Sequence, residues 1–193
     1  MENTTEVEIV KRYIDEGVRA RSLLDPHDVV EVARVVAHCF KNGKKLLLFG
    51  NGGSAADAQH IAAEFVGRFL KERRSLPALA LTTNTSALTA ISNDYSYELV
   101  FARQVEAFGE RGDVAFAIST SGNSRNVLEG VKAAKNLGIY TVGLTGGSGG
   151  KLKELVNKAV VVASDKTSII QEVHIAVGHM VYLLVERELF GGF

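Results

Sequence analysis

Four hydroxyl side chains cluster in one short turn, at Ser119, Thr120, Ser121 and Ser124. An apolar run precedes the turn and a helical apolar pattern follows it, so we expect the chain to pass from a strand through the turn into a helix. Such a unit presents unpaired amide N–H groups and the positive end of a helix dipole, which together favour a phosphate dianion. The turn therefore predicts a phosphate-binding site, and an ordinary capped turn with surface serines is the alternative.

Two residues of this turn refine the prediction. Gly122 allows the backbone to approach a ligand closely, and Ser124 is a good N-cap residue for the helix that follows. The turn lacks the Gly-Lys-Ser/Thr sequence of a P-loop, which argues against nucleotide hydrolysis.

A second glycine-rich turn, Asn51-Gly52-Gly53-Ser54, follows the apolar run 45–50. It opens a helical pattern that extends to about Leu70. In an open parallel α/β sheet, ligands bind at the carboxyl ends of the strands. We therefore expect this turn and the hydroxyl-rich turn to lie on the same edge of one sheet.

His60 and Glu64 are four residues apart in that helical pattern, so their side chains project from one face, with Asp57 close to the same stripe. An imidazole and a carboxylate at this spacing can share a metal ion or a proton. A surface His-Glu pair is the alternative. The adjacent glycine-rich turn favours the functional interpretation.

The last helical pattern, about 168–189, is almost entirely apolar, so its polar members are informative. They are Gln171, Glu172, His174 and His179. Gln171 and His179 are eight positions apart, about 80° around a helix, so one ligand set could reach both. His174 is a competing candidate that spacing does not exclude, and a histidine hydrogen-bonded in the core is the structural alternative.

The remaining patterns predict a three-layer α/β domain. Two helical segments, about 6–24 and 28–42, lead the chain, and they could form a subunit interface or cover the sheet of their own domain. Asn93 and Asp94 are expected in a break between helices, and a flexible loop is expected at 146–150. Five strands are predicted, at about 45–50, 79–82, 115–118, 139–145 and 159–163.

Composition limits the class of partner. The chain has 193 residues, and its 22 basic residues balance 22 acidic ones, so no overall charge attracts nucleic acid or an anionic membrane. We expect a small-molecule partner. The single cysteine, Cys39, lies in an apolar helical pattern, as a buried free thiol in a reducing cytoplasm would. No signal peptide and no membrane-spanning run are predicted.

Three segments together resemble the SIS (sugar isomerase) domain family, and within it the phosphoheptose isomerases. They are NGGSAADAQH at 51–60, STSGNS at 119–124 and IQEVH at 170–174. The resemblance covers nearly the whole chain, as one SIS domain over 1–193, with N-terminal helices at 1–43 and an α/β core at 44–193. It implies a flavodoxin-like fold with a five-stranded parallel sheet and a cytoplasmic homotetramer.

The resemblance also implies an activity, the interconversion of sedoheptulose 7-phosphate and D-glycero-D-manno-heptose 7-phosphate. This is the entry to bacterial heptose for lipopolysaccharide or related glycans. An aldose-ketose isomerase moves a proton between C1 and C2 through an enediol or enediolate, which requires a base and a group that protonates or polarises the carbonyl oxygen. A metal ion could polarise that oxygen instead.

The resemblance assigns roles residue by residue. Glu64 and His179 match the catalytic acid-base pair. Phosphate contacts match Ser119, Thr120, Ser121 and Ser124. Sugar contacts match Asn51, Gly52, Gly53, Ser54, Asn93 and Asp94, and Glu64 and Gln171 complete the substrate-binding set. A zinc ion would be held by His60, Glu64, Gln171 and His179.

Two alternatives of other classes are considered. A non-catalytic SIS relative binds the replication initiator, but that family is expected to lack the residues equivalent to Glu64 and His179, which this chain has. A sugar-phosphate sensor would be expected to carry a helix-turn-helix region or a basic patch, and the sequence predicts neither.

Overall fold

Five parallel strands form one sheet in the order β2-β1-β3-β4-β5. A computed structural model of the chain describes residues 5–68 and 72–191. The strands are β1 (Leu46–Gly50), β2 (Ala78–Ala80), β3 (Val114–Ile118), β4 (Tyr140–Gly146) and β5 (Lys158–Val162). Every residue of β1 and of β3 is buried, as expected for parallel strands covered on both faces.

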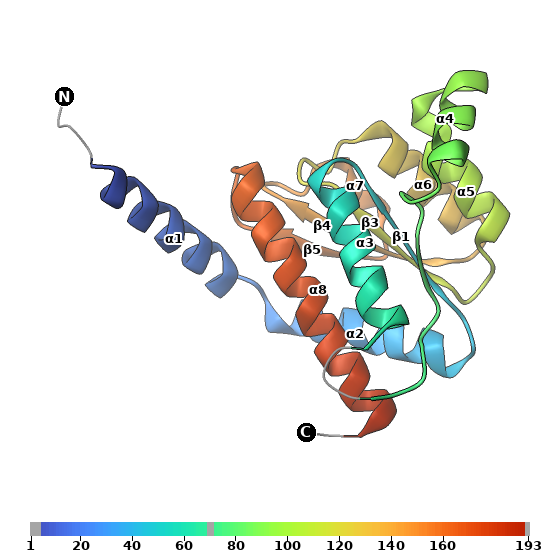
Figure 1. Cartoon of the computed structure of the whole chain (residues 1–193), viewed down its shortest axis with the longest axis horizontal. Helices are drawn as coiled ribbons and strands as arrows, with labels where there is room; N and C mark the ends of the chain where they lie inside the picture. Colours follow the sequence, from blue (N-terminus) through green and yellow to red (C-terminus); the bar gives the residue numbers. More distant parts are fainter. Residues whose placement is uncertain (1–4, 69–71, 192–193) are drawn as a thin grey trace.

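Helices cover both faces of the sheet (Figure 1). Those of the described residues are α1 (Glu6–Ser22), α2 (Pro26–Lys41), α3 (Gly53–Val66), α4 (Thr85–Asp94), the 3-10 helix η1 (Tyr97–Leu99), α5 (Val100–Phe108), α6 (Arg125–Asn136), α7 (Gly150–Leu155) and α8 (Thr167–Phe190). Helices α2, α3 and α8 pack with Leu46, Leu48 and Phe116 in one apolar cluster. Helices α5, α6 and α7 pack with Leu47 and Phe49 in a second. Side chains of alternate strand residues thus point to opposite faces of the sheet. The predicted three-layer α/β fold is confirmed.

The two leading helices differ in how they pack. Pro26 is the first residue of α2, after the N-cap Asp25, so this helix begins two residues before the predicted start at 28. Helix α2 covers the sheet through residues that include Cys39, whose pKa is raised to about 12 by burial. Helix α1 begins with a capping box between Thr5 and Glu8 and projects away from the body of the chain (Figure 1). Of the two leading helices, α2 therefore covers the sheet of its own domain and α1 does not.

Asn93 and Asp94 were expected in a break, but they are the last two residues of α4. Of the glycine-rich segment expected to be a loop, residues 147–149 do connect two elements, whereas Gly146 ends β4 and Gly150 begins α7. Helix α3 ends at Val66, and the end predicted near Leu70 lies outside the described residues.

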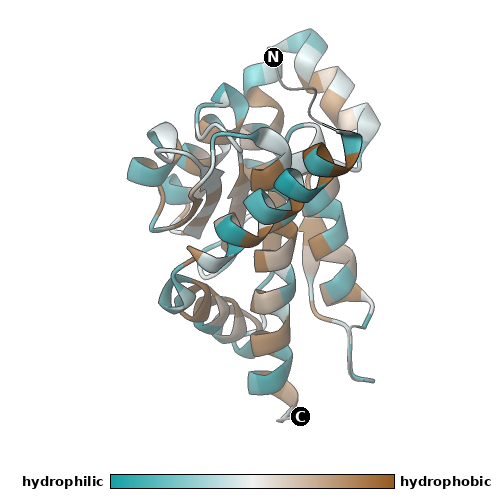
Figure 2. Ribbon diagram, turned by 90° about the vertical axis from the view of Figure 1, so that its left-hand side faces the viewer, coloured by the Kyte–Doolittle hydropathy of each residue, from teal (hydrophilic) through white to brown (hydrophobic). Residues whose placement is uncertain are grey.

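Helix α8 is long and apolar enough to cross a membrane, contrary to the expectation that the chain has no such run. In this fold it is a core helix, because half of its apolar window is buried, and it packs in the same cluster as α2 and α3. Figure 2 shows the apolar residues along α8 and the mixture of polar and apolar residues on α1, which faces the viewer.

Candidate functional site

The glycine-rich turn at 51–54 and the hydroxyl-rich turn at 119–124 lie side by side, as predicted. Strands β1 and β3 are paired to their ends, with Gly50 opposite Ile118, so the turns that follow leave the same edge of the sheet. Gly50 is held closely, because a Cβ there would lie 2.7 Å from the carbonyl oxygen of Ile118. Gly52 and Gly122 both adopt positive φ, at 55° and 65°, a conformation that favours glycine.

The hydroxyl-rich turn has the features of an anion site. The hydroxyls of Ser119 and Ser124 lie 3.0 Å apart. Ser124 is the N-cap of α6, but its side chain makes no cap hydrogen bond. Among the hydrogen bonds between described residues, none uses the backbone amides of Thr120, Ser121 or Ser124. These N–H groups at the start of a helix are therefore available to a phosphate.

A polar network joins the two turns, and the sequence did not predict it. Asn51 and Asn126 exchange two side-chain hydrogen bonds of 2.8 Å each. Tyr97 donates a third, of 3.0 Å, to the amide oxygen of Asn51. Asn126 is buried, so its amide fixes the orientation of Asn51 at the ligand-facing edge. An asparagine just inside a helix is common, and spacing alone gives no signal for this role.

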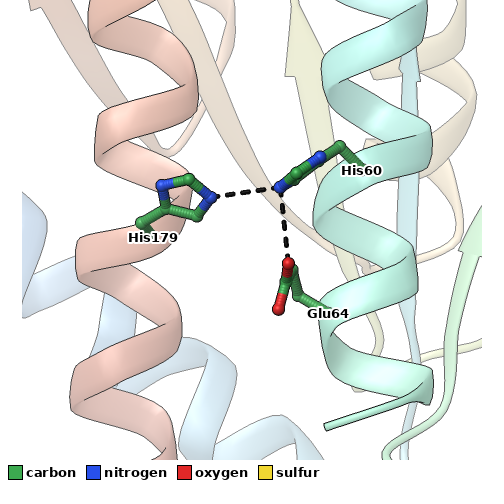
Figure 3. Close-up of side chains that lie close together, drawn as sticks. All are labelled: His60, Glu64 and His179. Carbon is green, nitrogen blue, oxygen red and sulfur yellow. Dashed lines mark hydrogen bonds and ion pairs between the residues drawn. The ribbon is translucent and has the colours of Figure 1, made fainter. Parts of the chain in front are cut away.

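His60, Glu64 and His179 form a cluster on α3 and α8, in which His60 is exposed and the other two residues are partly buried (Figure 3). The Nε2 atoms of His60 and His179 lie 3.1 Å apart, and Nε2 of His60 lies 3.4 Å from Oε1 of Glu64. One ligand atom from each residue lies within 4.8 Å of the others. The cluster joins α3 to α8, because Ile61 and Gly178, beside the histidines, are in close contact. The spacing argument for His60 and Glu64 therefore identified two members of a real cluster.

Gln171 does not join this cluster within the chain. A Cβ at Gly53 would collide with the amide group of Gln171, so the glutamine lies at the start of α3. Gln171 precedes His179 by eight residues, roughly 12 Å along the helix axis. The predicted four-residue metal set is thus divided, with Gln171 beside the sheet-edge turns and the other three residues further along α3 and α8.

Three other predicted site residues differ in their surroundings. Ser54 is buried against Gly50, at the sheet edge. Asn93 and Asp94 are exposed and hydrogen-bonded to each other at 2.9 Å. Tyr97, a few residues further along the chain, is the residue of this region whose hydroxyl reaches Asn51.

Three polar side chains have a buried atom without a hydrogen-bond partner among the described residues, namely Asp57 (Oδ2), Arg73 (Nε) and His174 (Nδ1). Burial raises the pKa of the Asp57 carboxyl to about 6, although the nearby His60 opposes the shift. His174 donates through Nε2 to the carbonyl of Thr145 at 3.1 Å, and burial lowers its pKa to about 4. His174 is therefore a neutral core histidine rather than a member of the cluster.

The cluster has the chemistry of a metal centre. Two imidazole nitrogens and one carboxylate are a ligand set found in catalytic zinc sites, where a fourth position stays open to water or substrate. The three residues alternatively form a proton-transfer group, since imidazole and carboxylate are the usual general acids and bases. Both roles require the side chains to be close together, as they are here.

Comparison with known proteins identifies the family. The SIS domain model matches residues 15–146. The chain belongs to this family. The SIS match covers β1, the hydroxyl-rich turn and β4, and thus includes the sheet edge described above.

Relatives within the SIS family are phosphoheptose isomerases. The probable phosphoheptose isomerase of Thermoplasma acidophilum is 53% identical over 178 residues, which are 92% of this chain and 98% of that protein. The phosphoheptose isomerase of Roseiflexus sp. is 60% identical over 162 residues, 84% of this chain and 82% of its own. The chain is therefore a member of the phosphoheptose isomerases, as the resemblance predicted.

A solved structure supports the same assignment. The phosphoheptose isomerase of Neisseria gonorrhoeae superposes with a TM-score of 0.89 at 42% identity, over 94% of this chain and 99% of that one. The five-stranded SIS fold is thus shared, and the expectation of a sugar-phosphate isomerase is confirmed at the level of the family.

Proposed function

We propose that the protein interconverts D-sedoheptulose 7-phosphate and D-glycero-D-manno-heptose 7-phosphate, the first step of bacterial heptose synthesis. The single observation that carries this proposal is the cluster of His60, Glu64 and His179 on the two helices that also border the phosphate-binding edge. The relatives named phosphoheptose isomerase support the substrate. Both residues that the non-catalytic SIS relatives are expected to lack, Glu64 and His179, are present.

The phosphate binds at the hydroxyl-rich turn. The free amides of Thr120, Ser121 and Ser124 and the positive end of α6 suit a dianion. Asn51, held by Asn126, together with the Gly52-Gly53 backbone, contacts the sugar hydroxyls. Ser54, Asn93, Asp94 and Gln171 complete the substrate set. In the open-chain heptose the phosphate and C1 are at opposite ends, so the reacting carbons lie away from the turn, toward the cluster.

Glu64 and His179 carry the proton transfers. Glu64 removes a proton from C1 of the ketose and returns it to C2. His179 donates a proton to the oxygen on C2 and accepts the proton of the C1 hydroxyl, so the enediol forms and collapses with protons in balance. Each positioned acid or base contributes on the order of 10²–10⁴ in rate.

The three cluster residues fit a zinc ion, since two histidines and a carboxylate provide its usual nitrogen and oxygen ligands. Bound there, zinc would act as a Lewis acid on the substrate oxygens. Glu64 would then be a ligand of the ion as well as the base.

The protein acts as a cytoplasmic homotetramer in this proposal. Helix α1 supports self-association, because its apolar residues Val10, Ile14 and Val18 are 57%, 56% and 63% exposed. A neighbouring groove of about 460 Å³ between α2 and α8 adds further apolar surface, lined by Leu24, Val29, Met180 and Leu183. Apolar surface on this scale marks a protein-protein contact. We treat 1–193 as a single SIS domain.

Proton NMR of the enzyme with sedoheptulose 7-phosphate in D₂O tests the proposal. We expect the aldose product to appear with deuterium at C2, because the proton removed by Glu64 exchanges with solvent. Parallel samples with and without a chelator test the need for metal. Failure to form the aldose under both conditions would remove the proposed reaction.

A further inference from the structure

Arg73 is an arginine with a buried side chain in the segment between α3 and β2, and neither the proposed reaction nor the sequence patterns account for it. Its side chain is only 1% exposed, as is that of Glu186 on α8, and Nε of Arg73 lies 3.4 Å from Oε1 of Glu186. A charge this deeply buried is costly unless it is paired and hydrogen-bonded. The burial of the Arg73–Glu186 ion pair therefore needs a structural explanation.

The guanidinium binds the last turn of α3. It donates to the backbone carbonyls of Glu64 at 2.8 Å and of Phe65 and Gly67 at 3.0 Å each. Carbonyls at a helix C-terminus lack hydrogen-bond partners within the helix and carry partial negative charge. A cationic donor such as a guanidinium both hydrogen-bonds these carbonyls and offsets their charge. One of these carbonyls belongs to Glu64, whose carboxylate is in the cluster.

The same guanidinium binds α8 close to His179. It donates to the hydroxyl of Tyr182, which is one helical turn after His179. It also pairs with Glu186, one further turn along. The Tyr182 ring packs against Phe65 of α3 with centroids 4.8 Å apart. Arg73 thus joins the backbone of Glu64 on one helix to the turns that follow His179 on the other.

We propose that Arg73, with Tyr182 and Glu186, is a positioning device that sets the register of α3 against α8 and so holds Glu64 and His60 against His179. This inference rests on the proposed function, in which those three side chains are the reacting group. Arginine suits the task because its rigid fork of five donors can bind several acceptors at once, whereas a lysine has one ammonium group. Small displacements at such a cluster matter, since an error of about 1 Å can lower the rate by about 10²-fold.

Three variants test the device with increasing severity. Tyr182→Phe removes one hydroxyl, Glu186→Gln removes the charge, and Arg73→Lys keeps the charge but loses the fork. For Arg73→Lys and Glu186→Gln we expect kcat for sedoheptulose 7-phosphate to fall about 10-fold to 100-fold, the range typical of residues that support a site indirectly. KM should change little, because the phosphate turn lies at the other end of α3.

Asp113→Asn is the matched control. Asp113 is a fully buried carboxylate paired with Lys45 at 2.9 Å, and it precedes β3, at the opposite edge of the sheet from the turns. Its loss should lower the thermal midpoint without changing kcat. An equal loss of kcat in Asp113→Asn and in the Arg73 variants would mean that general destabilisation explains both, and would overturn the inference.

A second readout does not depend on turnover. In chelator-treated protein without substrate, the rings of His60 and His179 should give imidazole NMR signals with a cross-relaxation contact, which should weaken in Arg73→Lys and Glu186→Gln. If those variants do not fold, the same measurement on Tyr182→Phe decides. Unchanged imidazole signals together with wild-type kcat would refute the positioning role. A wild type that fails to isomerise the sugar would refute the proposed function alone.

Discussion

The Nε2 atoms of His60 on α3 and His179 on α8 lie 3.1 Å apart, although the two residues are 119 positions apart in the sequence. Two N–H groups cannot face each other at this distance, so one ring donates and the other accepts, unless a cation lies between them. Glu64 adds a carboxylate 3.4 Å from His60. The fold therefore assembles a site that attracts positive charge before any ligand arrives.

Glu64→Gln should retain substrate binding and lose turnover. The amide has nearly the same shape but cannot act as a base, so we expect kcat to fall about 10²–10⁴-fold. Binding of sedoheptulose 7-phosphate, measured by calorimetry, should stay close to that of the wild type. Near-normal kcat in this variant would remove Glu64 from the mechanism. Glu106→Gln, on α5, is the control.

His60→Gln should reduce metal binding. The substitution removes one of three ligand atoms that lie within 4.8 Å of each other, and catalytic zinc sites use three protein ligands. The zinc content of dialysed protein, measured by emission spectroscopy, should fall well below that of wild type. His27→Gln, an exposed histidine at the start of α2, should leave it unchanged. Equal zinc in both variants would argue against the cluster as the metal site.

The sequence predicted the sheet and two of the three cluster residues for clear physical reasons. Strands buried on both faces appear as apolar runs, and side chains four residues apart share a helix face. These two patterns predicted β1, β3 and the pair of His60 and Glu64. The partner His179 was proposed from its polarity in an apolar helix and from the family resemblance. Its contact with His60 depends on how α3 and α8 pack, which periodicity does not encode.

Residues that act through tertiary contacts were missed. Asn126 and Arg73 stand in ordinary local contexts, and their roles come from partners 75 and 113 residues away. Gln171 was grouped with His179 because the angle around the helix permitted it, but the rise along the axis separates them. Helix α7 was missed because Gly149 and Gly150, which begin it, usually indicate a loop.

Ser119→Ala should weaken phosphate binding with little effect on the chemical step. The hydroxyl of Ser119 lies 3.0 Å from that of Ser124 in the phosphate turn. A hydrogen bond to a charged group contributes about 1.5–3 kcal/mol, so KM should rise about 10-fold to 100-fold at nearly constant kcat. Ser22→Ala, whose hydroxyl bonds only its own helix, is the control. A fall in kcat at constant KM would contradict the assignment.

Val10→Glu and Val18→Glu should disrupt the tetramer. Both side chains are more than half exposed on α1, and a charge at the centre of an apolar contact is costly to bury. Light scattering should show a lower mass for these variants than for the wild type. Lys11→Glu places the same carboxylate on α1 at a residue that is already charged, and its mass should not change. A wild type that is monomeric at all concentrations would contradict the proposal directly.

His174 should make the protein less stable in mild acid. Its pKa is lowered by burial from 6.5 to about 4 in the folded chain, so the unfolded chain binds the proton more readily. Stability is therefore unaffected above about pH 6.5 and falls as the pH drops from there to about 4, by up to about 1.4 kcal/mol per pH unit. His174→Gln can still donate to the Thr145 carbonyl but does not titrate in this range. Urea unfolding of both proteins between about pH 7.5 and about pH 4.5 should give stability curves that differ in slope only below about pH 6.5. Parallel curves would show that His174 does not carry the acid sensitivity.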